Sequence, residues 1–273
     1  MVRLVLPFVL AVVALTPPAG QSLSADDIAR RVQDRDTGRD SRSSMRMRLF
    51  DRQGRARERA LTMTSLRGRD SGGAAPSAPA GDRLLIRFTY PNDIRGTGFL
   101  VLEHPKGDDE RFLFLPSLGR VRRIAGSETQ ESFVGSDFTY EDIGGREFDE
   151  YTYAIVEENA TWTPPSGGAP RPAWRLQSTR RDAAAQFPRV VSTVLKDSFV
   201  VVAADIYNRR DERQKVYTVK RLEQVQKIWT AMESEMTNSL EKTRTELAVE
   251  KAEYNVGLKD TDFTRRELER GGK

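Results

Sequence analysis

Residues 112–143 read FLFLPSLGRVRRIAGSETQESFVGSDFTYEDI and are the most informative stretch of the chain. The stretch opens with four apolar residues, turns at residues 116–119 and continues as a short basic strand, which is the pattern of a β-hairpin. A polar segment without a clear period follows at residues 126–132, and an aromatic and acidic tail closes the stretch. None of it matches a catalytic motif.

Apolar and polar side chains alternate on both sides of this stretch, and a period of two is typical of half-buried strands. Before it, Met45, Met47 and Leu49 alternate with arginines, and Leu61 continues the pattern after a turn at residues 51–55. These residues predict a first hairpin. Further strands are expected at residues 84–90, 99–103, 111–115, 151–155, 174–176, 190–195, 199–207, 216–222, 225–230 and 243–249.

Helical signals are few and short. Ser24 followed by Asp27 has the pattern of a capping box and predicts a helix at residues 25–34, and another short helix is expected at residues 262–270. The chain is therefore predicted to be mainly β with few short helices, in the α+β class. An open sheet leaves its apolar face and its edges unprotected. We therefore expect a strongly curved antiparallel sheet that forms an open half-barrel around the helices, with an apolar hollow inside.

The N-terminus has the pattern of a signal peptide, with Arg3, an apolar run at residues 4–15 and small or turn-forming residues at 17–24. The apolar run is shorter than the ~20 residues that a spanning helix needs. Residues 1–24 are therefore predicted to be a signal peptide, cleaved between residues 19 and 25. Residues 25–273 are expected to form a single secreted domain.

The composition excludes several classes of function. Cysteine is absent, which removes disulfides, thiolate zinc sites, cysteine nucleophiles and N-terminal lipidation together. Lys and Arg number 44 against 40 Asp and Glu, so the surface is mixed in charge and nucleic-acid binding is not expected. With a single histidine, His104, and no nucleophile or metal motif, we expect no enzyme, no metal and no other cofactor.

Three stretches have a specific pattern: RLLIRFTYPNDIRGTGFLVLE at 83–103, FLPSLGRVRRI at 114–124 and GSDFTYEDI at 135–143. In these stretches the sequence resembles the outer-membrane lipoprotein-sorting proteins, the LolA/LolB-like periplasmic carriers. The resemblance extends over the closing strands and terminal helix expected at 235–270. The chain departs from the family near residue 74 and at residues 164–172. The resemblance implies a LolA-like half-barrel whose hollow carries acyl chains.

Binding an acyl chain needs apolar area and no chemistry, since each buried methylene contributes about 0.8 kcal/mol. The residues expected to line the hollow are Met47, Leu49, Phe88, Tyr90, Phe99, Val101, Phe112, Phe114 and Phe138. The same side chains also suit a filled core, because small barrels usually fill their interiors with side chains. The sequence leaves both alternatives open.

A second group is expected to gate the mouth of the barrel or to meet a lipid head group or a partner: Arg120, Arg122, Arg123, Asp137, Tyr140 and Glu141. The arginines either pair with the acidic tail at residues 137–142 or meet an anionic lipid. Pairing is favoured because both signs of charge occur in one local segment. Residues 126–140 are expected to move as a gate.

These observations predict a periplasmic, non-enzymatic and monomeric carrier, a chaperone that shelters a lipid or acylated lipoprotein on its way to the outer membrane. The resemblance implies an inner-membrane RND-type (MMPL-like) transporter as a partner. The alternative is an accessory interaction subunit of such an exporter, with a filled barrel.

Overall fold

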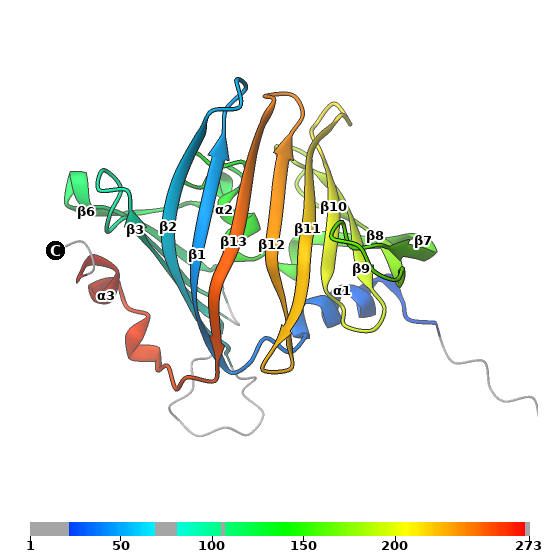
Figure 1. Ribbon diagram of the computed structural model, residues 1–273, viewed down its shortest axis with the longest axis horizontal. Coiled ribbons are helices and arrows are strands. Elements are labelled where there is room, and N and C mark those ends of the chain that lie inside the picture. The colour runs from blue at the N-terminus through cyan, green and yellow to red at the C-terminus, as the bar shows by residue number, and fades with distance from the viewer. Residues whose placement is uncertain (1–21, 69–80, 105–106, 271–273) are drawn as a thin grey trace, which may run out of the picture.

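The computed structural model describes residues 22–68, 81–104 and 107–270. In these residues thirteen strands form one antiparallel sheet in the order β6-β5-β4-β3-β2-β1-β13-β12-β11-β10-β9-β8-β7. The sheet is not closed, because β6 and β7 are its two edges. The protein is therefore mainly β, as its alternating sequence predicts. Figure 1 shows the central strands side by side, with α2 behind them.

The sheet has two halves that meet where β1 pairs with β13. The first half contains β1 (Asp40–Phe50), β2 (Ala56–Leu66), β3 (Arg83–Tyr90), β4 (Gly98–Leu102), β5 (Glu110–Leu115) and β6 (Arg120–Arg123). The second half contains β7 (Tyr151–Trp162), β8 (Arg171–Arg180), β9 (Arg189–Leu195), β10 (Val201–Tyr207), β11 (Arg213–Val225), β12 (Ile228–Asn238) and β13 (Thr243–Tyr254). Each half is a series of hairpins between neighbours in sequence.

Most predicted strands are confirmed, but one boundary is wrong. The sequence places a strand at 225–230, whereas the structure turns at Gln226 and Lys227 and continues as β12 to Asn238. Both turn residues are left-handed, with φ of 51° and 71°, as a two-residue hairpin turn requires. The turn carries no glycine or asparagine, so its usual sequence signal is missing.

Three α-helices occur in the described residues. The predicted first helix is confirmed as α1 (Ala25–Asp34), capped by Ser24 and Asp27 as expected. The C-terminal helix is shorter than predicted, with α3 spanning Arg265–Arg270 after a 3₁₀ turn at Asp260–Asp262. The remaining helix, α2 (Tyr140–Gly144), was not expected from the sequence.

Residues 124–144, which we call the inner segment, connect the end of β6 to the end of α2. Four of their side chains, Ile124, Phe133, Phe138 and Tyr140, belong to one buried apolar cluster. That cluster contains residues from both halves of the sheet: Leu49, Phe88 and Phe99 from the first half and Val190, Ile206 and Met236 from the second. The inner segment therefore lies against both halves of the sheet at once. Its hydrogen bonds between backbone groups stay within the segment, apart from two at its ends, where Ile124 N–H donates to Arg111 O and Gly145 N–H donates to Glu141 O.

Candidate functional site

The apolar interior is occupied by the chain's own aromatic rings. Of the nine residues expected to line a hollow, six lie in the buried cluster around the inner segment: Met47, Leu49, Phe88, Phe99, Val101 and Phe138. Phe133, which the sequence reasoning missed, is fully buried at their centre. Its ring centroid lies 5.9 Å from that of Phe88, 5.5 Å from Phe99 and 5.6 Å from Tyr140.

The other three expected lining residues lie elsewhere. Tyr90 is 52% exposed at the end of β3. Phe112 and Phe114 lie on the opposite face of the sheet, where they pack with Leu268 of α3. The strand register explains this, because Leu113 pairs with Phe99 and takes the interior position, so its neighbours in sequence point away. An apolar run does not tell which alternate residues face inward.

Polar contacts fix the tip of the inner segment, residues 132–138, to the second half of the sheet. The two carboxylate oxygens of Asp137 accept hydrogen bonds from the hydroxyls of Thr243 at 2.5 Å and Thr245 at 2.7 Å. The backbone N–H of Asp137 donates to Thr245 Oγ1 at 2.9 Å, and Lys215 Nζ donates to the Asp137 carbonyl at 2.8 Å. Asp137, expected to gate the mouth, therefore connects the segment to β11 and β13.

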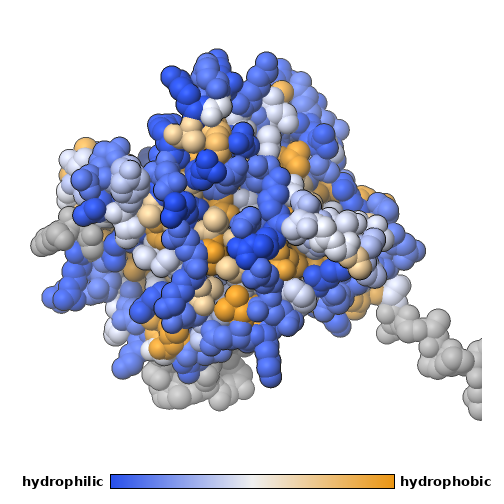
Figure 2. All heavy atoms as spheres, in the orientation of Figure 1, coloured by the Kyte–Doolittle hydropathy of each residue, from blue (hydrophilic) through white to orange (hydrophobic). Residues whose placement is uncertain are grey.

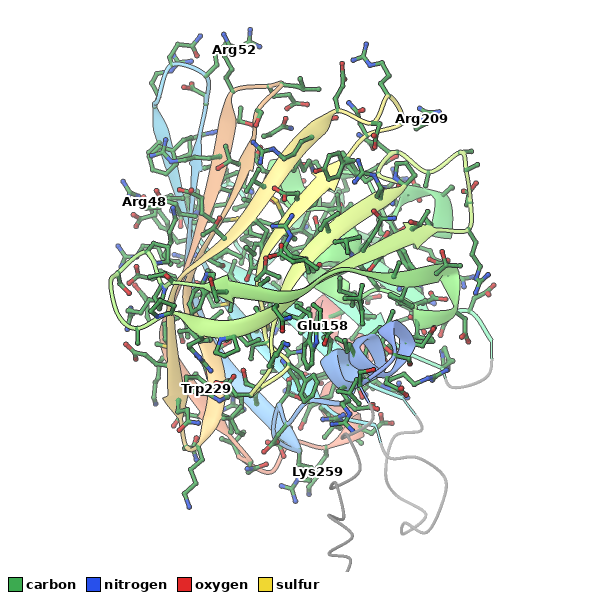
Figure 3. The ribbon with its side chains drawn as sticks, turned by 90° about the vertical axis from the view of Figure 1, so that its right-hand side faces the viewer. Arg48, Arg52, Glu158, Arg209, Trp229 and Lys259 are labelled. Atoms are coloured by element: carbon green, nitrogen blue, oxygen red, sulfur yellow. The ribbon has the colours of Figure 1, made fainter. Side chains whose placement is uncertain are left out.

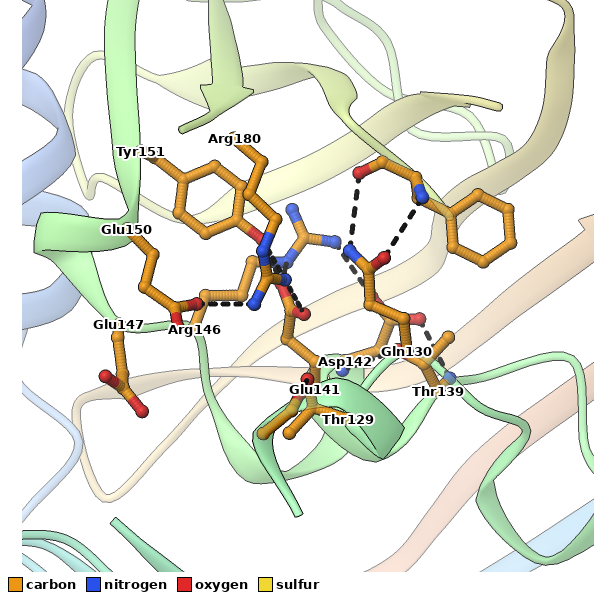
Figure 4. A network of polar contacts seen from close by, with 12 residues as sticks. Thr129, Gln130, Thr139, Glu141, Asp142, Arg146, Glu147, Glu150, Tyr151 and Arg180 are labelled. Atoms are coloured by element: carbon orange, nitrogen blue, oxygen red, sulfur yellow. Dashed lines mark hydrogen bonds and ion pairs between the residues drawn. The ribbon is translucent and has the colours of Figure 1, made fainter. Parts of the chain in front are cut away.

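A buried ionic network fixes the other end (Figure 4). Glu141, in the first turn of α2, accepts from Arg180 Nη1 at 2.5 Å and from the Tyr151 hydroxyl. Asp142 accepts from Arg146 Nη2 at 2.8 Å. Burial raises the pKa of Asp142, but the charge of Arg146 and the Thr139 N–H bond outweigh it and hold the pKa below its usual value. Asp142 therefore stays ionised and paired with Arg146.

The arginines of β6 do not pair with this acidic tail, so the favoured pairing is wrong. Arg120 and Arg123 are exposed on the edge strand, and Arg122 pairs with Glu128 at 2.9 Å. Glu141 and Asp142 instead meet Arg180 of β8 and Arg146 beyond α2, and Asp137 meets β13. β6 lies at the edge of the sheet. Tyr140, which was expected to belong to a gate, is buried against Phe99 and Phe133.

A pocket of about 350 Å³, which we call the mouth pocket, opens above the tip of the inner segment. The segment supplies Ser132, Gly135, Ser136 and Asp137, and the sheet supplies Leu49, Arg57, Lys215, Asn238 and Thr243. It lies where β1 and β12 end and β11 begins. In Figure 3, Arg52 and Arg209 mark the turns at this end of the sheet.

The outer face of the central strands has a different character. A hollow of about 340 Å³ there is lined mainly by charged side chains, including Arg46, Arg48 and Glu246. These charges pair with one another, as in the contact of 3.2 Å between Arg48 and Glu246. Figure 2 shows this face as largely hydrophilic. We therefore place the candidate site at the inner segment and its mouth pocket.

Neither a metal-ligand cluster nor a membrane-spanning helix occurs where the structure is described. No group of three or more His, Asp or Glu side chains in residues 22–68, 81–104 and 107–270 is arranged to hold a metal ion. None of the helices in those ranges has the length and apolar character needed to cross a bilayer.

Several solved bacterial structures share this fold. A DUF1329 family protein from Desulfovibrio piger is 29% identical, with a TM-score of 0.76, and the match covers 89% of this chain and 97% of that one. A domain from Vibrio parahaemolyticus, named as an outer membrane lipoprotein-sorting protein, is 28% identical, with a TM-score of 0.77 over 90% and 98% of the two chains. A LolA superfamily protein from Nitrosomonas europaea, 14% identical, has a TM-score of 0.66 over 90% and 100%.

A family model described as “Uncharacterized protein”-like matches residues 80–270. The chain belongs to this family. Together with the solved structures, the match confirms the resemblance to LolA-like outer-membrane lipoprotein-sorting proteins. No match was found among the curated proteins.

Proposed function

We propose that the protein is a periplasmic carrier that binds the acyl chains of a lipid or lipoprotein inside its sheet, without catalysing a reaction. The name of the Vibrio parahaemolyticus domain, an outer membrane lipoprotein-sorting protein, supports this proposal. The observation that carries it is the way the interior is filled. The filling belongs to one segment, which hydrogen-bonds mainly to itself and is attached to the sheet largely through side chains.

Such a segment is suited to exchange with a ligand. An acyl chain that replaces Phe133, Phe138 and Tyr140 gains about 0.8 kcal/mol per buried methylene. The lost contacts of the rings offset part of that gain, which keeps the affinity moderate, as a carrier that must release its cargo requires.

The tip of the segment also stores strain. Val134 has φ of 49° and ψ of 39°, a left-handed conformation that is unfavourable for a β-branched side chain. Such a residue costs on the order of 1–3 kcal/mol. Arg59 Nη1 holds it in place by donating to the Val134 carbonyl at 2.5 Å. Displacement of the segment would release this strain and so favour opening.

The same proposal includes the finer features expected from the sequence. The sheet would curve as an open half-barrel around its contents, and the protein would act as a secreted monomer that is not itself lipidated. The signal peptide predicted for residues 1–24 lies almost entirely outside the described residues, which begin at residue 22.

The test uses an engineered disulfide that can reversibly fix the inner segment to the sheet. The chain has no cysteine, so a disulfide in the double variant Asp137→Cys with Thr245→Cys would be unique. The two native side chains already hydrogen-bond to each other, which brings these positions close together. We expect the reduced variant to take up a fluorescent fatty acid and the oxidised variant to lose uptake.

The single variants Asp137→Cys and Thr245→Cys, treated with the same oxidant, are the controls and should keep their uptake. Equal uptake by the oxidised and reduced double variant would show that the segment does not open to admit the chain.

The second candidate is an accessory interaction subunit of an inner-membrane RND- or MMPL-type lipid exporter, with a permanently filled barrel. The full burial of Phe133 favours it. The names of the three solved structures described above do not mention such an exporter, so this partner remains a prediction. The absence of any uptake by the unmodified protein would favour this candidate.

A further inference from the structure

The buried ammonium of Lys215 is the least expected group in the interior. Lys215 lies on β11 opposite Asn238 and is 5% exposed. It shares a strand face with Tyr217 and Val219, where the period of the strand otherwise places apolar or aromatic side chains. Burial lowers its pKa because the charged form loses its hydration. A charge in such a position needs partners that replace water.

Its present partners are only partly sufficient. Lys215 Nζ donates to the Asp137 carbonyl and lies 4.5 Å from the centroid of the Phe187 ring. Within the described part of the chain it forms no ion pair within 4.0 Å. An ammonium has three N–H donors, so two remain for an acceptor in the mouth pocket.

The charges around Lys215 have other partners and leave it available to an anion. The Asp142 carboxylate, whose charge raises the pKa of Lys215, is bound by Arg146 Nη2 at 2.8 Å. The Asp137 carboxylate is held by Thr243 and Thr245 on the side of the sheet. Asp51 is bound by Arg55 Nε at 2.7 Å and by N–H groups of its own turn. Glu241 lies exposed at the rim, where solvent screens it, and Arg57 adds a second cation to the lining.

The tip of the inner segment contributes both to the mouth pocket and to the apolar interior. Ser132, Gly135, Ser136 and Asp137 line the pocket, while Phe133 and Phe138 belong to the buried apolar cluster. If the segment moves out, the Asp137 carbonyl leaves Lys215 at the same time as the two rings leave the apolar cluster. The two vacated positions suit a molecule with an acceptor at one end and an apolar chain at the other.

We propose that the mouth pocket binds the anionic head group of an amphiphile, a carboxylate or a phosphate, with Lys215 as its counter-charge, while the acyl chain enters the interior. This inference rests on the proposed carrier function and narrows its cargo to amphiphiles with anionic oxygens in the head group. The neutral donors and acceptors around the pocket complete the site: Gln130, Ser132, Gln186, Gln214 and Asn238.

The experiment compares ligands that share a chain and differ in the head group: palmitic acid, cetyl alcohol and palmitoyl lysophosphatidic acid, each below its critical micelle concentration. We expect the unmodified protein to bind at least one of the anionic ligands about tenfold or more tightly than the alcohol, as a hydrogen bond to a charged group provides. The tighter of the two anions identifies the head group as carboxylate or phosphate.

Three variants assign the preference to Lys215. Lys215→Met should bind acid and alcohol with similar affinity, whereas Lys215→Arg keeps the charge and should keep the preference. Lys220→Met is the matched control, because Lys220 lies on the same strand but lines the outer hollow and pairs with Glu235 at 3.0 Å. It should bind like the unmodified protein. Circular dichroism on each variant checks the fold, and Lys215→Arg keeps the test valid if Lys215→Met fails to fold.

The outcomes separate this inference from the proposed function. Tight binding of all three ligands without preference would overturn the head-group site and leave the carrier function standing. A preference that survives in Lys215→Met would overturn the role of Lys215. Failure of every ligand to bind the unmodified protein would overturn both.

Discussion

Two segments cover opposite faces of β3–β5: α3 is the outer cover and the inner segment is the inner cover. They are attached to the sheet in different ways. On the outer side, α3 places Leu268, which is fully buried, over Gly98. A Cβ at Gly98 would lie 2.6 Å from Leu268 Cδ1, so glycine there allows the helix to approach the strand. On the inner side, the inner segment adds directed polar contacts to its aromatic packing.

The two covers also differ in how far their attachments reach. The contacts of α3 with the sheet are with β4 and β5, and Arg87 of β3 donates to the Glu267 carbonyl. The inner segment is held by Arg59 from the first half and by Lys215, Thr245 and Arg180 from the second. A cover fixed at polar points across two halves of a sheet is suited to release, whereas a local cover held mainly by apolar packing serves chiefly to exclude water.

Replacing the central ring of the inner cover should have the largest effect. Phe133→Ala removes a fully buried ring, and we expect it to lower the free energy of unfolding by about 3–5 kcal/mol, as such truncations do. The cavity it leaves should raise the uptake of a fluorescent fatty acid, because part of the filling has gone. Urea unfolding and a binding titration measure the two effects.

Leu268→Ala is the matched truncation on the outer cover. It should cost about 2 kcal/mol, near the lower end for leucine, because a terminal helix relaxes easily into the vacated space. Fatty acid uptake should stay unchanged. If Leu268→Ala raised fatty acid uptake as much as Phe133→Ala does, the inner segment would have no special role in admitting the ligand.

Breaking the ionic attachment of the inner cover should have the next largest effect. Arg180→Met removes the main partner of Glu141, whose side chain is 6% exposed, and we expect a loss of about 3 kcal/mol in the free energy of unfolding. The Tyr151 hydroxyl and Arg146 remain near the carboxylate and limit the loss.

The control for this variant is Arg46→Met on the outer face. Both side chains of the Arg46–Glu250 pair are nearly half exposed, so water replaces the pair readily and the loss should be much smaller. Equal losses in the two variants would contradict a special role for the buried network.

The mainly β class and the first helix were predictable from the sequence because alternation and capping are local signals. Met47 and Leu49 share a face by strand period alone, and Ser24 with Asp27 marks the start of α1. The failures occur where a local signal is ambiguous. Phe112 and Phe114 belong to an unbroken apolar run, and only pairing with β4 shows that Leu113 takes the inner face.

The candidate site was less predictable, since its contacts join distant parts of the chain. Asp137 and Glu141 were selected for their place in the acidic tail, but their partners Thr245 and Arg180 are 108 and 39 residues away. Nothing near either residue marks the pairing. Lys215 did leave a signal, because a charged residue on the same strand face as Tyr217 and Val219 breaks the expected pattern.

The smallest expected effect concerns the pH dependence of the inner cover. Burial raises the pKa of Glu103 to about 7, and Asp82 and Asp109 add to the shift. The folded state thus holds this proton more tightly than the unfolded state, so stability is lost as pH rises from about 4.5 to about 7. Glu103→Gln should remove this loss, stabilising the protein by about 1–3 kcal/mol near pH 8 and hardly at all near pH 4.5.

The loss of stability should be located near α2. A Cβ at Gly145 would lie 3.4 Å from Glu103 Oε1, so we expect hydrogen exchange to show the loss around α2. A loss confined to α3 would instead make the outer cover the pH-sensitive one.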